Sequence, residues 1–267
     1  MKKPVLAVLA VFAAACTGTG TSTDNKVKPM NIRIENEYGT ALVSWEKPEE
    51  KELHYDVLIH TVSGSDGGKT GDMVCNVPTE QESFRAGDYI AWYAQEHEYY
   101  GPVAVQVTAY DGETVIAQGE SESFMAEECF PAVKELILGE DVKPEDITLI
   151  SWSGTGEMRE DNFHITLLKE DDEYTLDAEF YDENGPHTAD RTVDAEIFEQ
   201  AKNYLEGGRI VRKTVEDPEI VWLDYSKSGY QLWWNGMSEL ERSRYEFLPA
   251  EPQEWHFKEF LKEITLK

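Results

Sequence analysis

Positive charge is scarce in this chain of 267 residues, which holds 24 Lys and Arg against 53 Asp and Glu and has a net charge of −29. The shortage argues against a nucleic-acid partner, because phosphate contacts need clustered lysine and arginine. It also argues against electrostatic docking to anionic lipid. Hydrophobic residues make up 40% of the chain, which is too many for intrinsic disorder. We therefore expect a folded, acidic protein of one large or two small domains.

Long apolar runs are also missing. The N-terminal run, residues 4–15, is shorter than the about 20 residues that a membrane-spanning helix needs. It follows Lys2-Lys3 and has the length of a signal-peptide core. It ends in Ala13-Ala14-Ala15-Cys16, which resembles the lipobox of bacterial lipoproteins, with alanine at 13 where leucine is usual. The alternative is an ordinary signal peptide, in which Cys16 is incidental.

The lipobox resemblance implies that residues 1–15 are removed and that Cys16 is lipidated at the mature N-terminus. The acyl chains would anchor the exported protein to the bacterial cell envelope. Removal of Lys2 and Lys3, with no acidic residue, takes the net charge from −29 to −31. Residues 16–28 are rich in Thr and Gly, which predicts a flexible tether.

Cysteine is rare, and only Cys75 and Cys129 remain beside Cys16. An exported compartment can oxidise such a pair to a disulfide. The alternative is two buried thiols, because the sequence does not place their Cα atoms within bridging distance.

Residues 29–126 show the alternation and turn signals of short strands. A break at residues 86–100 has apolar residues at helical spacing (Ile90, Tyr93, Ala94, His97), with Asp88 as the expected N-cap. The strands are expected at 31–35, 40–45, 54–60, 103–110 and 114–124. This pattern predicts an all-β, immunoglobulin-like sandwich.

The same region resembles a fibronectin type III module. The resemblance is carried by Pro29, by Leu42-Val43-Ser44-Trp45 with Pro48 after it, by Tyr55-Asp56-Val57, and by residues 101–109 and 119–123. Val103 stands where the family usually has tyrosine, and the helix at 86–100 replaces a strand. Such modules are mostly spacers and binding units, so the resemblance implies no particular activity.

Residues 127–146 are expected to be a linker, with a short helix from Pro131 to Leu138 that Gly139 ends. Residues 147–267 then predict an α+β domain with an antiparallel sheet and two helices. Its strands are expected at 147–152, 163–168, 174–181, 220–225 and 230–234. One helix follows the cap Asp194, with Ile197, Phe198, Ala201, Tyr204 and Leu205 on one face, and the other starts at Pro252, with Phe257, Phe260, Leu261 and Ile264 on one stripe. The order of elements resembles an uncharacterised domain of lipoproteins from gut and oral bacteria, to which no activity is attached.

No catalytic, metal or cofactor motif stands out. The loop at residues 64–70 has one residue too few between its glycines for a phosphate-binding loop. The acidic clusters at 170–173 and 182–184 lack the spacing of a calcium loop, which favours solvated hairpin tips. His54 and His60 are about 20 Å apart on an extended strand, too far to share zinc. The expectation is a protein without catalytic residues, metal or cofactor.

Aromatic residues are the one enriched group, with 7 Trp and 13 Tyr. Trp233 and Trp234 are adjacent on a predicted strand, so their side chains point to opposite faces. Trp92-Tyr93 is a similar pair. Exposed aromatic rings suit sugar stacking or protein contact, and these four residues are the candidate ligand contacts. The alternative is that they pack in the core.

Together these features predict a non-enzymatic cell-envelope lipoprotein, with a sandwich spacer and an α+β module that contacts a glycan or another envelope protein. The rival hypothesis is an extracellular glycan hydrolase or its accessory subunit, which needs two convergent carboxylates with raised pKa in a concave pocket. A third hypothesis is that the second domain mediates dimerisation or binds a partner protein.

Overall fold

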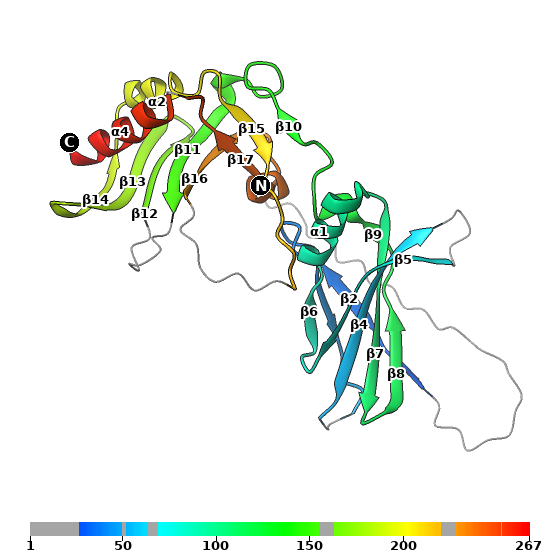
Figure 1. Ribbon diagram of the computed structural model, residues 1–267. Coiled ribbons are helices and arrows are strands. Elements are labelled where there is room, and N and C mark those ends of the chain that lie inside the picture. Colours follow the sequence, from blue (N-terminus) through cyan, green and yellow to red (C-terminus); the bar gives the residue numbers. More distant parts are fainter. Residues whose placement is uncertain (1–26, 50–51, 64–68, 155–162, 220–227, 252) are drawn as a thin grey trace, which may run out of the picture. The chain divides into compact units, whose positions relative to one another are not determined.

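The computed structural model of the chain describes residues 27–49, 52–63, 69–154, 163–219, 228–251 and 253–267. These residues form two compact units, unit 1 up to Phe130 and unit 2 from Pro131 onward (Figure 1). Four predicted features lie outside the described residues: Cys16 with its leader, nearly all of the tether, the glycine loop at 64–68 and the strand at 220–225. Among the described helices, none has the length and apolar character to cross a membrane.

The part of unit 1 that the structure describes has two sheets and one α-helix. The larger sheet has the order β1-β8-β7-β4-β5 with β9 also on β7, and the smaller has the order β2-β3-β6. The strands are β1 (Lys28–Pro29), β2 (Ile32–Glu35), β3 (Leu42–Trp45), β4 (His54–Ser63), β5 (Lys69–Thr79), β6 (Ser83–Arg85), β7 (Pro102–Asp111), β8 (Thr114–Glu120) and β9 (Phe124–Met125). All five strands predicted here are present.

The two sheets of unit 1 bury apolar residues between them. Trp45 of β3 meets Tyr55 of β4 edge to face, with ring centroids 5.2 Å apart. Val57 and Ile59 on β4 are fully buried. The chain at Met30 passes so close to Gly119 of β8 that only glycine fits there, because a Cβ atom would lie 2.0 Å from the Met30 carbonyl oxygen. The core therefore lies between the sheets, each covering the other.

The helix predicted in the middle of unit 1 is present. It is α1 (Gly87–His97), and the predicted Ile90, Tyr93 and Ala94 are buried. Two details of the prediction are wrong. Ala86, not Asp88, is the N-cap, and His97 is exposed because the helix ends there.

In its described residues, unit 2 has one sheet of eight strands and three α-helices. Its order is β10-β15-β17-β16-β11-β12-β13-β14, and every pair is antiparallel. The elements are β10 (Glu135–Leu136), β11 (Ile147–Gly154), β12 (Phe163–Glu170), β13 (Glu173–Asp182), β14 (Gly185–Thr192), α2 (Ala195–Lys202), β15 (Arg209–Arg212), β16 (Ser228–Trp234), α3 (Glu239–Arg244), β17 (Tyr245–Leu248) and α4 (Gln253–Leu266). Short 3-10 helices occur at Ala126–Glu128 in unit 1 and at Pro144–Asp146 in unit 2.

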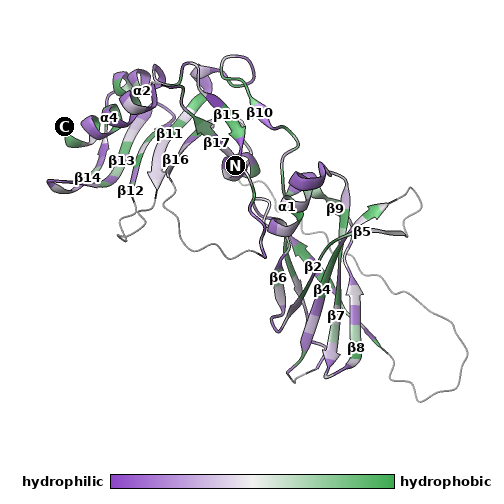
Figure 2. Ribbon diagram, in the orientation of Figure 1, coloured by the Kyte–Doolittle hydropathy of each residue, from purple (hydrophilic) through white to green (hydrophobic). Residues whose placement is uncertain are grey.

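Helices α2 and α4 lie side by side over one face of strands β12 to β14 (Figure 1). Phe198 and Ala201 of α2 and Phe257 and Leu261 of α4 are fully buried, as their spacing predicts. The helix α4 carries both hydrophilic and hydrophobic segments (Figure 2), as expected when one face is buried. We call this side of the sheet the helix face.

Residues 131–138 differ from the prediction, because they form no helix and contribute strand β10 to the edge of the sheet. Residues far away in the sequence donate hydrogen bonds to the backbone carbonyls that would otherwise accept hydrogen bonds within a helix. Arg212 donates to the carbonyls of Pro131 and Ala132, and the Tyr245 hydroxyl donates to the Val133 carbonyl at 2.7 Å. Burial raises the pKa of Tyr245 to about 12.

The prediction of two helices in this domain is also wrong, since α3 is a third.

Candidate functional site

The first predicted aromatic pair lies on α1 in unit 1. Tyr93 is 8% exposed and packs against Tyr99, with ring centroids 6.0 Å apart. Burial, then the nearby Asp72 carboxylate, raises the pKa of Tyr93. Trp92 is half-buried. Tyr93 therefore has a packing role, which leaves Trp92 as the more accessible member of the pair.

The second predicted pair lies on β16 in unit 2. Leu232 is buried in the helix-face core, so Trp234 shares that side and Trp233 points to the other. Both tryptophans are half-buried and pack against core residues. Trp233 stands opposite Leu149 of β11 in the register of the sheet. Trp233 is thus the aromatic residue on the side of the sheet away from α2 and α4.

That side of the sheet carries a row of polar side chains, which we call the polar row. The register joins its members as direct cross-strand partners on five neighbouring strands: Gln231, Ser151, Thr166, Asp177 and Asp190. At about 4.8 Å between strands, the row is about 19 Å long. Each member offers a hydroxyl, an amide or a carboxylate, and Trp233 lies two residues along β16 from the first.

The polar row becomes more exposed from its centre towards the sheet edge. Ser151 is 6% exposed, and its hydroxyl lies 2.8 Å from that of Thr166. The Asp177 side chain is 69% exposed, and its Oδ1 lies 3.3 Å from Nε2 of His164. Asp177 and Asp190 face each other directly, which is unfavourable for two carboxylates. The outer end of the row therefore carries two carboxylates, and the row contains no lysine or arginine that could neutralise them.

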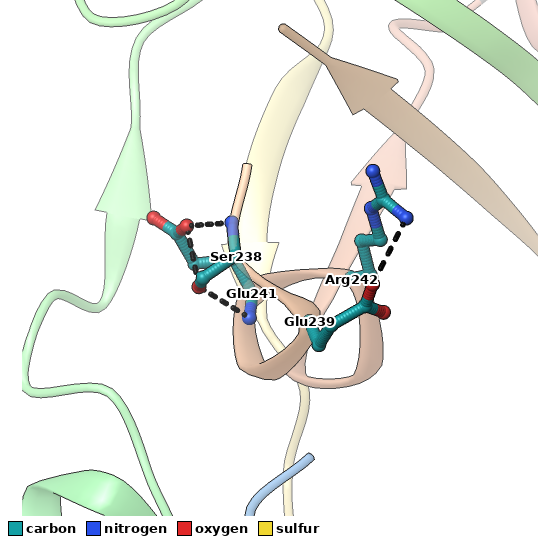
Figure 3. Close-up of polar contacts among 4 residues, drawn as sticks. All are labelled: Ser238, Glu239, Glu241 and Arg242. Carbon is teal, nitrogen blue, oxygen red and sulfur yellow. Dashed lines mark hydrogen bonds and ion pairs between the residues drawn. The ribbon is translucent and has the colours of Figure 1, made fainter. Parts of the chain in front are cut away.

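Helix α3 brings a cation to the other end of the row. Ser238 starts the helix with a capping box: its hydroxyl oxygen accepts from the Glu241 backbone N–H at 3.2 Å, and the Glu241 carboxylate accepts from the Ser238 N–H at 2.7 Å (Figure 3). Arg242, on this helix, pairs with Glu239 at 3.3 Å and lies over the Trp233 ring, 4.8 Å from its centroid. This cation–π contact orients the indole.

The chemistry of this face suits hydrogen bonding rather than nucleophilic attack. Ser153 stands opposite His164 in the register, which brings a serine, a histidine and Asp177 near one another. A triad needs its acid shielded from water to orient the histidine, whereas the side chains of His164 and Asp177 are 40% and 69% exposed. Hydroxyl, amide and carboxylate groups on a rigid sheet can instead hold a polyhydroxylated ligand.

The two cysteines of unit 1 are both buried, Cys75 on β5 and Cys129 just after the 3-10 helix at Ala126–Glu128. Helix α1 contacts both of these elements. The disulfide between them stays a prediction, which alkylation and intact-mass measurement under non-reducing conditions would test.

Sequence reasoning missed the polar row, although one signal of it was present. The alternation Thr175, Asp177, Glu179 along β13 marks a strand with one wholly polar side. The other members come from strands distant in sequence, and only their pairing brings them together. No protein-family model matches the chain, and no curated protein matches it significantly.

Proposed function

We propose that the protein is a cell-envelope lipoprotein that binds a glycan through the polar row and Trp233 of unit 2. The lipidated Cys16 would anchor it, and unit 1, as a fibronectin type III-like sandwich, would serve as spacer. The lipobox-like Ala13-Ala14-Ala15-Cys16 supports the anchor, and the two facing sheets of unit 1 are compatible with the spacer.

The single observation that carries the glycan proposal is the polar row beside an oriented indole. Sugars present hydroxyl groups that pair with amides, hydroxyls and carboxylates, and apolar ring faces that stack on aromatic side chains. Gln231, Thr166 and Asp177 supply the first kind of contact. Trp233, held under Arg242, supplies the second. Two exposed carboxylates that face each other, Asp177 and Asp190, cost stability, which is typical of a surface kept for binding.

The test is a glycan array probed with the chain from Thr17 onward, followed by titration of any hit. Asp177→Asn removes one acceptor from an exposed position, so we expect at least a tenfold weaker affinity. The melting temperature should stay the same or rise, because the repulsion with Asp190 is lost. Glu196→Gln on α2 removes another exposed carboxylate, on the helix face, and serves as the control. Trp233→Phe keeps an aromatic ring and should weaken binding less than Trp233→Ala.

Two outcomes would contradict the proposal. One is a folded protein that retains no glycan on the array and none from an envelope extract. The other is a hit that Asp177→Asn and Glu196→Gln weaken equally, because binding would then depend on net charge and not on the row.

A further inference from the structure

Two buried hydrogen-bond donors on the helix face of unit 2 have no acceptor. Trp152 of β11 and Tyr230 of β16 are cross-strand partners, 9% and 6% exposed, with ring centroids 6.3 Å apart. The indole Nε1 of Trp152 and the hydroxyl of Tyr230 are both shielded from water and complete no hydrogen bond. Buried donors are nearly always paired, since an unpaired one costs free energy.

A carboxylate lies close to one of these donors. Burial, then the Glu254 carboxylate, raises the pKa of Tyr230, so Glu254 lies close to the hydroxyl. The Oε1 atom of Glu254 pairs with the Lys258 ammonium at 2.7 Å. Glu254 is thus a neighbour of the Tyr230 hydroxyl that completes no hydrogen bond with it, and Trp152 Nε1 has no hydrogen-bond partner.

Two lysine ammonium groups of α4 converge on the same rings. Lys258 Nζ lies 5.5 Å from the ring centroid of Trp152 and 5.9 Å from that of Tyr230. Lys262 Nζ lies 5.7 Å from the Trp152 centroid, and its own carboxylate partner, Glu259, is 3.6 Å away. Each ammonium group has one glutamate partner, and together they bring two cationic donors to the rings beside the unpaired indole.

Apolar rings line the remainder of this region. Phe163 packs against Trp152 with centroids 4.7 Å apart, and Phe257 stacks on Tyr230 at 5.5 Å. Such walls lower the local dielectric constant, which strengthens the attraction between an anion and the two ammonium groups. The side chains of Lys258 and Lys262 are 29% and 37% exposed, so they connect the buried donors with solvent.

We propose that the Trp152–Tyr230 pair of β11 and β16, with Lys258 and Lys262 of α4 beside it, is a second binding site, for a compact oxyanion such as a carboxylate or a phosphate. Trp152 Nε1–H and the Tyr230 O–H donate to the oxyanion, and Lys258 and Lys262 supply the charge. The site lies on the helix face, opposite the polar row, and is independent of the glycan proposal.

The experiment follows the Trp152 indole N–H by NMR in the purified, ¹⁵N-labelled protein, with Trp152→Phe to assign its signal. Acetate, glucuronate and inorganic phosphate are titrated at constant ionic strength against chloride. We expect a saturable shift of this signal with at least one oxyanion and none with chloride. The tighter of the carboxylate and phosphate titrations identifies the class of the natural ligand.

Variants separate a site from general charge effects. Lys262→Ala should weaken the oxyanion at least tenfold. The matched control is Lys202→Ala on α2, because Lys202 also lies over an aromatic ring, 5.6 Å from the Phe198 centroid, and pairs with Glu199, but has no orphaned donor beside it. This control should leave the titration unchanged.

A stability measurement gives a second, independent readout. Tyr230→Phe removes an unpaired hydroxyl, so the melting temperature without ligand should stay the same or rise, while the oxyanion-dependent rise should shrink. The proposal is overturned if no oxyanion shifts the Trp152 signal, if chloride shifts it equally, or if Lys202→Ala and Lys262→Ala act alike.

Discussion

Unit 1 and unit 2 bury the apolar sides of their sheets in different ways. In unit 1 a second sheet supplies the cover, and contacts such as Trp45 against Tyr55 join the two. In unit 2 helices α2 and α4 cover one side of a single wide sheet. The other side of that sheet carries Ser151, Thr166 and Asp177.

The difference shows where binding chemistry can be placed. A sandwich uses the inner sides of both its sheets for the core, and its stability depends on their apolar fit. A sheet with helices on one side has a rigid second side, and its exposed residues, such as Asp177, are not needed for packing. Polar side chains placed there keep a fixed spacing, which suits a binding surface better than a loop does.

The largest effect is expected from removing one core side chain in each unit. Phe257→Ala in unit 2 and Ile59→Ala in unit 1 both remove fully buried side chains, which should cost about 3–5 and about 2–5 kcal/mol of unfolding free energy. Because each unit has its own core, hydrogen exchange should lose protection only in the mutated unit. Loss of protection in both units with either variant would show that the units unfold as one cooperative structure. That result would contradict the conclusion that each unit depends on its own core.

A smaller effect is expected at the capping box of α3. Ser238→Ala removes the acceptor for the Glu241 N–H, which should cost about 1 kcal/mol in urea unfolding. Fraying of α3 would also release Arg242 from the Trp233 ring and weaken glycan binding. Ser243→Ala on the same helix removes a hydroxyl that bonds back to the Leu240 carbonyl, not a cap, and is the control. Equal losses from both variants would contradict a specific role for the cap.

The smallest effect on stability is expected at the β13–β14 turn, an exposed hairpin at the edge of the sheet of unit 2. Hydrogen bonds from His187 and from the Asn184 backbone N–H lower the pKa of Asp182. The stabilisation is therefore complete above the unfolded-state pKa, about 3.9, and is lost as the pH falls through the lower folded-state value.

NMR of the Asn184 amide proton measures this titration directly. Its chemical shift should change with a midpoint below the ordinary aspartate pKa, and Asp182→Asn should abolish the change. A midpoint at or above the ordinary value would show that the hairpin contacts do not favour the carboxylate.

Several elements were predictable because their residues repeat at the period of the structure. The alternation in β12 and the stripe of α4 are examples, and both elements are present. Strand β14 escaped prediction because its residues are mostly polar and its pairing with β13 holds it in the sheet. Helix α3 escaped because it is a six-residue polar segment stabilised by its cap. The helix expected at residues 131–138 failed because Arg212 and Tyr245 bind the backbone carbonyls there.

The acidic charge, the β-rich character and the helix stripes follow from the amino-acid sequence, since each depends on composition or on residues close together in the chain. Which tryptophan of the pair faces the polar row, and which polar residues lie beside it, depends on the folded sheet. Cross-strand register depends on pairing between distant segments, and a shift by one residue would turn every side chain of a strand to the other face.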